Sequence, residues 1–369
     1  MSAEHTEGTK IRAEREPIAV SAHPHDFASD NHAGAHPEVL EAIAAANTGH
    51  AASYGADPWT KRARAAFREH FGPQAEAHIV FNGTGANVSS LDALTGRQEA
   101  VICTDTAHMH VDECGAPERL AGTKLLTVTT EHGKLEPGHI RQWESKRGDE
   151  HHVQPRLVSI TQATELGTVY TAAETRAIAD AAHELGMLLH IDGARLANAA
   201  ASLGASLGEI TTDAGADVLS FGGTKNGLVF GEAVVFLRSG LGDGFEFTRK
   251  QLGQLASKMR FASAQFEALL GPGELWLRNA RHSNEMAARL AGAVGGIAGV
   301  ELVHPVEANG VFARLERPAI DRLLAADPAD HPFYLWDEDE HVVRWMCSWD
   351  TTPGDVDAFA SSVADATRG

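Results

Sequence analysis

The sequence predicts an α/β fold in which a mostly parallel sheet forms a large domain and a smaller α/β domain follows it. Short apolar runs alternate with amphipathic helical stretches between about residues 76 and 237, the rhythm of βαβ units. Several of these runs end in glycine-rich or acidic turns, and ligands bind at such strand ends in open α/β sheets. The pattern changes after about Gly240, where a new set of helices and strands begins.

Four segments follow from this pattern. Residues 1–20 are polar and are expected to form a mobile tail. Residues 21–57 are expected to contribute to the small domain and to the mouth of the site. Residues 58–255 are expected to form the large, ligand-binding domain, and residues 256–369 the small C-terminal domain.

Composition favours a soluble, cytoplasmic enzyme. The chain of 369 residues is 43% hydrophobic and 22% charged, enough for a sizeable core. Its net charge of −19 is spread along the chain, which disfavours nucleic acid and anionic membranes as partners. Three cysteines form no disulfide framework, no apolar run reaches the roughly 20 residues of a membrane span, and no signal-peptide core is present.

Helix starts are well marked in the first half of the chain. Pro37 can open a helix with Leu40, Ile43 and Ala44 on one face. Asp57 is a predicted N-cap before Pro58, and Thr171 with Glu174 forms a capping-box pattern.

A strand, a glycine turn and a helix follow one another at residues 78–94. The strand is expected at 78–81 and the helix at 86–94, with Gly83, Thr84 and Gly85 in the turn between them. Free amides at the start of a helix, together with its dipole, favour a phosphate group. We therefore predict an anion site at this turn.

Two further strand ends carry charged side chains. The apolar run at 188–191 leads into Asp192, a buried acid that needs a cationic partner, and Arg195 follows. The run at 218–221 leads through Gly222 and Gly223 to Lys225, preceded by Thr224. A lysine held among small residues can lose its proton and attack a carbonyl, although most turn lysines are simply solvated.

The C-terminal part is predicted to begin with one helix at 247–270 and a second from Pro272 and Gly273 to about residue 294. Strands near 300–303, 310–315 and 342–347 alternate with helices near 318–326 and 354–367. Arg344 lies in the last strand among apolar neighbours, where an unpaired charge is expensive.

Pyridoxal phosphate (PLP) fits these features. Its ring nitrogen would be the cationic partner of the aspartate, and its aldehyde would be the carbonyl that the lysine attacks. The turn D-G-A-R at Asp192 and the run S-F-G-G-T-K-N-G around Lys225 resemble the aspartate aminotransferase-like (fold type I) PLP enzymes. Among them the chain is most similar to the L-threonine aldolases of the β-eliminating lyase group, over about residues 27–357. The resemblance implies retro-aldol cleavage of threonine or a related β-hydroxy-α-amino acid, and a homodimer or homotetramer.

The resemblance also implies roles for individual residues. Lys225 would hold the cofactor, Asp192 its ring nitrogen, and His108 would stack on the ring, since it matches the histidine of an A-H-x-x-x-x-E-x-G pattern. The remaining implied cofactor contacts are Gly83, Thr84, Gly85, Arg195, Thr224 and Arg260, the last often across a subunit boundary. The implied substrate contacts are Ser29, Tyr54, Arg195 and Arg344.

Some alternatives stay open. The run from His108 to Cys114 has His-x-His spacing, but it lacks an accompanying zinc motif, so no metal is expected. The family's histidine after the strand at 157–160 is missing here, which leaves Glu165, His32, His108 or a bound water to take the substrate hydroxyl proton. A β-eliminating lyase or an aminotransferase is the alternative within the cofactor class. A nucleotide-binding module is disfavoured because no phosphate-loop motif is present.

Overall fold

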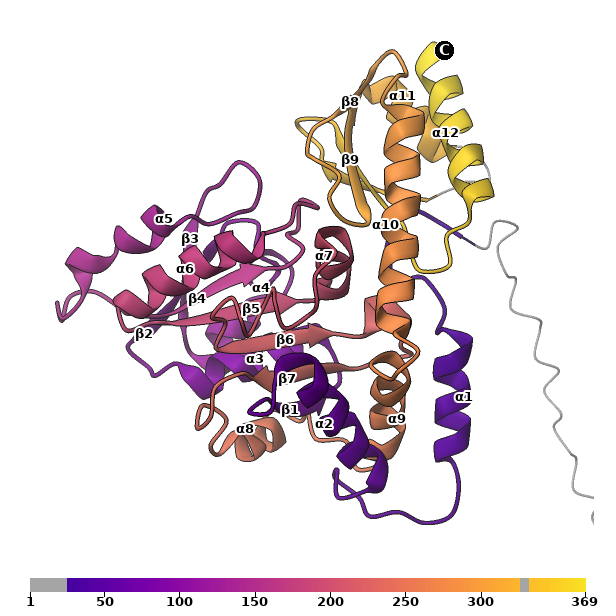
Figure 1. Cartoon of the computed structure of the whole chain (residues 1–369). Coiled ribbons are helices and arrows are strands. Elements are labelled where there is room, and N and C mark those ends of the chain that lie inside the picture. Colours follow the sequence, from indigo (N-terminus) through magenta and orange to yellow (C-terminus); the bar gives the residue numbers. More distant parts are fainter. Residues whose placement is uncertain (1–24, 326–331) are drawn as a thin grey trace, which may run out of the picture.

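A seven-stranded sheet with helices on both faces forms the larger part of the molecule (Figure 1). The structure, a computed structural model, describes residues 25–325 and 332–369, so the tail predicted at 1–20 lies outside the described residues. β2 to β6 run parallel to their neighbours among themselves, whereas β7 is antiparallel to both β6 and β1. In spatial order the strands are β1 (Glu76–Val80), β7 (Glu232–Phe236), β6 (Val218–Gly222), β5 (Leu188–Gly193), β4 (Gln154–Thr161), β2 (Glu99–Thr104) and β3 (Lys124–Val128).

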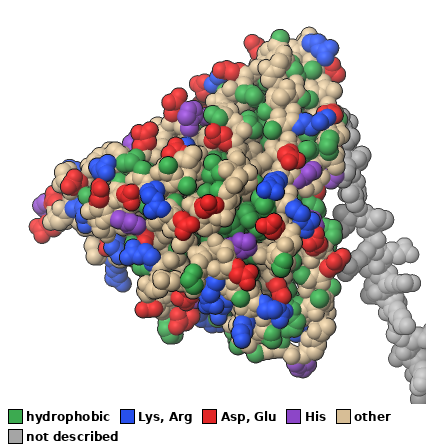
Figure 2. Space-filling model, in the orientation of Figure 1, with side chains coloured by type: hydrophobic (Ala, Val, Ile, Leu, Met, Phe, Trp, Pro, Cys, Tyr) green, Lys and Arg blue, Asp and Glu red, His purple; other side chains and the backbone are tan. Residues whose placement is uncertain are grey.

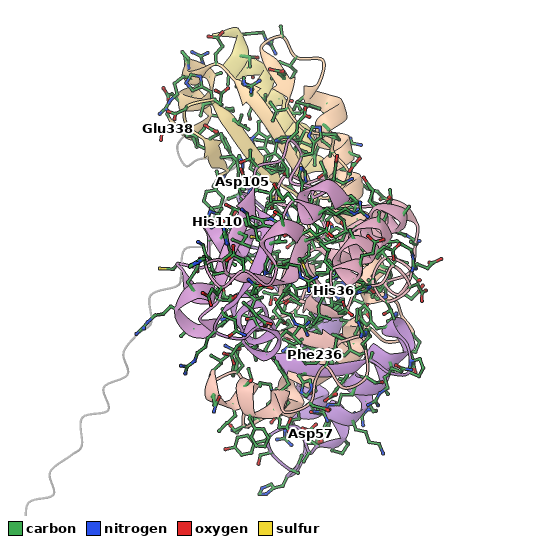
Figure 3. The ribbon with its side chains drawn as sticks, turned by 90° about the vertical axis from the view of Figure 1, so that its left-hand side faces the viewer. His36, Asp57, Asp105, His110, Phe236 and Glu338 are labelled. Atoms are coloured by element: carbon green, nitrogen blue, oxygen red, sulfur yellow. The ribbon has the colours of Figure 1, made fainter. Side chains whose placement is uncertain are left out.

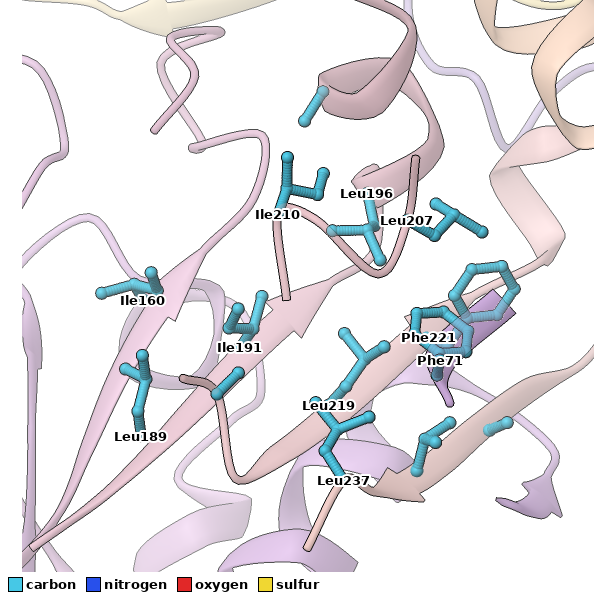
Figure 4. Packing of buried hydrophobic residues seen from close by; sticks show 14 of the residues in the cluster. Phe71, Ile160, Leu189, Ile191, Leu196, Leu207, Ile210, Leu219, Phe221 and Leu237 are labelled. Carbon is cyan, nitrogen blue, oxygen red and sulfur yellow. The ribbon is translucent and has the colours of Figure 1, made fainter. Parts of the chain in front are cut away.

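Alternation along the strands buries both faces of this sheet. Leu188 and Val218 pack on the side of α3 (Gly83–Leu94), whereas Leu189 and Leu219 pack on the opposite side (Figure 4). The other helices of this part are α2 (Pro58–Phe71), α4 (His108–Val111), α5 (Pro137–Arg141), α6 (Ala172–Glu184), α7 (Leu196–Leu203), α8 (Phe245–Gln251) and α9 (Met259–Leu269), with short turns η1 (Pro117–Ala121), η2 (Glu144–Lys146) and η3 (Thr224–Asn226).

A second, four-stranded antiparallel sheet forms the C-terminal part. Its spatial order is β10 (Tyr334–Asp337), β11 (Val342–Met346), β9 (Gly310–Leu315) and β8 (Val300–Leu302), and it packs with α10 (Leu275–Val294), α11 (Arg317–Ala325) and α12 (Pro353–Arg368). The segment before α1 (Pro37–Ala46) joins this part, because the Phe27 carbonyl accepts a hydrogen bond from the Met346 amide at 2.8 Å. In Figure 3, Glu338 lies at this end of the molecule and Asp57, at the start of α2, at the opposite end.

The predicted caps of α2 and α6 are confirmed. Asp57 Oδ1 accepts a hydrogen bond from the Thr60 amide at 2.8 Å. Thr171 and Glu174 form a reciprocal capping box at the start of α6. Both patterns are local in sequence, which is why the chain alone reveals them.

Four expectations about the fold were wrong or incomplete. The helix predicted at 247–270 is two helices, because the chain leaves α8 after Gln251 and turns at Gly253, whose φ of 74° is left-handed. α1 buries Val39 and Ala46 and packs Ile43 against the core as predicted, while Leu40 is 51% exposed, so the predicted apolar face is wrong at Leu40. The sequence analysis also missed the strands β3 and β10.

No helix in the described part of the chain is long and apolar enough to span a bilayer. Acidic and basic side chains are interspersed over the face shown in Figure 2, without a patch of one sign.

Candidate active site

A pocket of about 280 Å³ opens beside the carboxyl ends of β5 and β6 and the first turn of α3. It brings together six residues that the sequence singled out, namely Gly83, Thr84, His108, Asp192, Thr224 and Lys225. The remaining lining residues are Asn31, Asn82, Ala86, Ala194, Ser220 and Glu232. Strand ends of an open α/β sheet are the usual place for such a site.

Lys225 lies in η3, the turn that follows β6. Close packing fixes this turn, because a Cβ atom at Gly222 would lie 2.4 Å from the Ala194 carbonyl oxygen. Glu232 on the neighbouring strand accepts a hydrogen bond from the Gly223 amide at 2.8 Å. Burial, with the charge of Arg195, lowers the pKa of Lys225 and so favours the neutral amine that attacks a carbonyl.

Asp192 ends β5 as a buried carboxylate. Its Oδ2 accepts a hydrogen bond from Asn87 Nδ2 at 2.8 Å, and its Oδ1 accepts one from the Ala194 amide at 3.1 Å. Among the described residues, no Lys, Arg or His nitrogen lies within 4.0 Å of this carboxylate. A buried charge without a cation in contact suits a protonated ring nitrogen, which PLP would supply.

The first turn of α3 offers amide donors to an anion. Among the described residues, the Gly83 and Thr84 amides have no hydrogen-bond acceptor within the protein. The Gly85 amide was predicted to face the phosphate as well, but it donates a hydrogen bond to Asn82 Oδ1 at 2.7 Å. A Cβ atom at Gly85 would clash with the Gln254 side chain at 2.4 Å, so this glycine admits a packed neighbour.

His108 begins α4 and lines the pocket. In Figure 3, Asp105 and His110, on either side of it in the sequence, are labelled on the large domain below the small sheet. His108 Nδ1 lies 2.9 Å from Glu113 Oε1, and this hydrogen bond is the main cause that raises the pKa of His108. The amide of His108 donates to Glu165 Oε1 at 2.8 Å. Burial raises the pKa of Glu165 to about 7, which leaves it able to exchange a proton near neutral pH.

Arg195 is held by Asp30, which comes from the segment before α1. Arg195 Nε and Nη2 donate to the two Asp30 carboxylate oxygens at 2.7 and 2.9 Å. Burial alone would raise the pKa of Asp30, but Arg195 and Lys225 outweigh it and lower this pKa to about 2. Asn309 Nδ2 donates to Asp30 as well, at 3.0 Å, so Asp30 joins the large sheet to the small one.

Arg344 is a partly buried cation on β11. Its guanidinium lies 5.4 Å from the ring centroid of Tyr334 and 5.1 Å from that of Trp336. Its Nη2 donates to the Ala28 carbonyl at 3.3 Å, its Nε is buried without a partner, and no carboxylate among the described residues lies within 4.0 Å. Burial and the charge of Arg195 lower the pKa of Arg344, as expected for a cation that lacks an anion.

Six predicted residues do not line this pocket: Gly85, Arg195 and Arg344, described above, and Ser29, Tyr54 and Arg260. Ser29 lines a small neighbouring hollow, where its Oγ accepts a hydrogen bond from the Asn31 amide at 3.2 Å. Tyr54 is 52% exposed and lies under the Lys250 ammonium, at 5.3 Å from the ring centroid. Arg260 donates to the carbonyls of Thr48 and Gly49 at 3.3 and 3.2 Å. The chain by itself therefore does not bring Tyr54 or Arg260 to its pocket.

Two polar residues of the site were not predicted from the sequence: Glu232, which lines the pocket, and Asn87, which contacts Asp192. Asn87 lies one helical turn after Thr84, a spacing that puts both on one face of α3. Glu232 is the one acid in the otherwise apolar strand β7, a signal of the same kind as Asp192.

Fold and pocket together define a class. A lysine, a buried aspartate and free amides at a helix N-terminus surround one pocket in a mostly parallel α/β sheet, and these groups fit the aldehyde, ring nitrogen and phosphate of PLP. The molecule is a PLP enzyme of the aspartate aminotransferase-like fold.

The chain belongs to the Beta-eliminating lyase family, whose profile matches residues 26–318. It is 49% identical over 330 residues to a low specificity L-threonine aldolase of Pseudomonas aeruginosa, covering 89% of this chain and 94% of the relative. It is 48% identical to the low specificity L-threonine aldolase of a Pseudomonas species, covering 91% and 96%. The solved structure of Leishmania major threonine aldolase superposes with a TM-score of 0.87 at 32% identity, covering 93% of this chain and all of that one.

Proposed function

We propose that this chain is a PLP-dependent aldehyde-lyase that splits L-threonine, L-allo-threonine or a related β-hydroxy-α-amino acid into glycine and an aldehyde. The observation that carries the proposal is Arg344, a partly buried guanidinium without an acidic partner within 4.0 Å in the described structure. A fork of N–H donors in this state suits the α-carboxylate of an amino acid. Similarity to two L-threonine aldolases supports aldol cleavage over β-elimination or transamination.

The residues divide the work as follows. When bound, PLP supplies a ring that accepts the electrons released as the Cα–Cβ bond breaks. Lys225 would hold the cofactor through its aldehyde, and Asp192 would pair with the ring nitrogen. Arg344 would fix the carboxylate and so set the angle of the bond to be broken, whereas Ser29 lies in the neighbouring hollow and Arg195 is paired with Asp30.

Of the candidates for taking the hydroxyl proton, one lines the pocket and another contacts that residue. His108 lines it, and Glu165 contacts the His108 amide. His32 differs, because its Nδ1 is bound to Asp26 Oδ2 at 2.9 Å and its side chain is 46% exposed. His108 and Glu165 are thus better placed than His32 to act as the base.

Arg344→Lys is expected to raise the KM for L-threonine at least roughly tenfold and to lower kcat, because lysine keeps the charge but loses the two-pronged contact. The assay measures glycine formed from L-threonine by the holoenzyme. Cofactor absorbance and melting temperature should stay close to those of the wild type.

Arg314→Lys is the matched control, since Arg314 lies on the adjacent strand β9 and pairs with the exposed Glu301 at 2.7 Å. Its kinetics should not change. Lower thermal stability of Arg344→Lys with unchanged kinetics would show that Arg344 is a structural residue, and absence of glycine from the wild-type reaction would refute the lyase proposal.

We also propose that the chain works as a homo-oligomer, a dimer or a tetramer, in which Tyr54 and Arg260 of one copy serve the pocket of another. Exposed apolar side chains lie near Tyr54 and elsewhere on the large domain. Lys250 on α8 contacts Tyr54, and α8 also carries Phe247, which is 67% exposed. Phe81 and Phe230, both more than a third exposed, stack on each other at 6.0 Å between centroids.

Mixing two inactive variants tests this arrangement. Lys225→Ala and Arg260→Ala copies carrying different tags are refolded together, and the mixed oligomers are isolated. If Arg260 serves a neighbour, each mixed pair has one intact site, so about half of the wild-type activity per pair should return. Mixed pairs that stay inactive would place Arg260 at its own chain's site, and full activity of Arg260→Ala alone would remove it from the site altogether.

The cytoplasm is the compartment we propose. All three cysteines, Cys103, Cys114 and Cys347, are free. Burial raises the pKa of the Cys103 thiol to about 12, so this residue stays a thiol under ordinary conditions. Free cysteines are typical of reducing compartments.

A further inference from the structure

Three buried side chains and the partly exposed His108 form a continuous line of hydrogen bonds beside the cofactor pocket. His108 Nδ1 lies 2.9 Å from Glu113 Oε1, Asn87 Nδ2 donates to the same Oε1 at 2.9 Å, and it also donates to Asp192 Oδ2 at 2.8 Å. The residues come from α4, the loop after it, α3 and β5. Asn87, Glu113 and Asp192 are each at most 4% exposed.

The single amide nitrogen of Asn87 separates two carboxylates. It carries two hydrogens, and each one points at a different carboxylate oxygen. Asn87 Oδ1 is buried without a partner in the described structure, a cost that the two donated bonds must offset. Turning the amide over would place that oxygen against both carboxylates, so the two acids fix its orientation.

The Glu113 and Asp192 carboxylates both contact one amide nitrogen, at 2.9 and 2.8 Å. Like charges at short range disfavour double ionisation, whereas hydrogen bonds donated to the charged form favour it. Asn87 donates one hydrogen bond to each of the two carboxylates. Its amide therefore has an electrostatic function in addition to filling space.

We propose that Asn87 is a positioning residue that keeps Glu113 and Asp192 ionised side by side, so that one charge holds His108 and the other pairs with the cofactor's ring nitrogen. The inference deepens the proposed function, on which it rests for the identity of the cofactor. The inference does not depend on which substrate is cleaved, because Asn87 makes both hydrogen bonds to residues of the protein itself.

Other charged and titratable groups face this pair and stay in place in every variant below. They are His108 from α4, Lys225 from η3, Arg195 after β5, Glu165 after β4 and His190 on β5. Since they are common to all the proteins compared, the effects of the variants are measured as differences from the wild type at each pH.

The test titrates apoenzyme with PLP from pH 6 to pH 9 and follows cofactor absorbance. Asn87→Leu, similar in size but without a donor, is expected to bind PLP about tenfold more weakly than the wild type at pH 7, because Asp192 then shares a proton with Glu113. The deficit should shrink to about twofold or less at pH 9, where the shared proton leaves. An Asn87→Leu protein that matches the wild type at every pH would overturn the proposal.

The double variant Asn87→Leu with Glu113→Gln decides between an electrostatic and a purely structural role. It has one carboxylate instead of two, so no proton is shared and PLP affinity should return to within about threefold of the wild type at pH 7. A structural role for Asn87 predicts that the double variant binds no better than Asn87→Leu. That outcome would also overturn the proposal.

Two further variants keep the experiment decisive. Asn87→Ala removes the donor without adding bulk or charge, so it serves if Asn87→Leu does not fold, and it should show the same deficit that fades with rising pH. Ser90→Ala is the control, because Ser90 is buried on the same helix but donates only to the Ala86 carbonyl, at 2.8 Å. Its PLP affinity should be that of the wild type. Since no substrate is added, a chain that binds PLP as expected but forms no glycine would contradict only the proposed reaction.

Discussion

Replacing Lys225 with alanine is expected to abolish turnover and the visible absorbance of the bound cofactor. The turn that carries Lys225 is set by close backbone packing at Gly222 and by Glu232, so the variant should fold normally. Without the amine, no group in the turn can attach to the cofactor aldehyde, and activity should fall by several orders of magnitude. Borohydride treatment followed by mass spectrometry detects any covalent cofactor.

Lys124→Ala provides the control for this experiment, because Lys124 is exposed on β3 at the edge of the sheet. It should keep the borohydride-reducible cofactor and full activity. A reducible linkage that persists in Lys225→Ala would show that another residue holds the cofactor.

Asp192→Asn is the second variant with a large expected effect, a fall in kcat of roughly 10²- to 10⁴-fold. The substitution keeps the shape of the side chain, so Asn87 can still donate to it. It removes the negative charge that keeps the ring nitrogen protonated, and an unprotonated ring accepts electrons poorly. The backbone amides of Gly83 and Thr84, which are expected to bind the cofactor phosphate, are unchanged, so PLP should still bind. Steady-state kinetics of glycine formation at saturating PLP measure the effect.

Asp217→Asn distinguishes loss of this charge from loss of any buried carboxylate. Asp217 is fully buried beside the same sheet and accepts hydrogen bonds from the Leu189 amide and from Arg238. Its variant should melt at a lower temperature with kcat unchanged, the opposite of the result expected for Asp192→Asn. Turnover close to wild type in Asp192→Asn would remove the aspartate from the electron-accepting step.

The residues that the sequence placed correctly at one pocket have local signals. Lys225 follows an apolar strand and two glycines, and Asp192 interrupts an apolar strand with a charge. Thr84 lies in a glycine turn that starts a helix. Because parallel strands present their carboxyl ends at one edge of a sheet, three separate local patterns are enough to predict one site.

The parts that the sequence did not predict depend on contacts between distant segments. The ion pair of Arg195 with Asp30 joins residues 165 positions apart, and the sequence around neither residue predicts it. The break between α8 and α9 puts Gln254 against Gly85, a contact that a helical pattern in one segment cannot reveal. Leu40 was predicted on the buried face because α1 is rich in alanine, and apolar residues around most of the helix leave the direction of its buried face undefined by sequence.

The contact between Ala28 and Arg344 sets the order in which the site can be completed during synthesis. The two residues are 316 positions apart, and the nearby Phe27 carbonyl bonds to the Met346 amide. At typical elongation rates the segment with Ala28 and Asp30 emerges from the ribosome roughly 15 to 60 s before β11 follows. The lysine and aspartate strands can pair during that interval, since β5 and β6 are neighbours. The mouth of the site therefore closes last, after nearly the whole chain has left the ribosome.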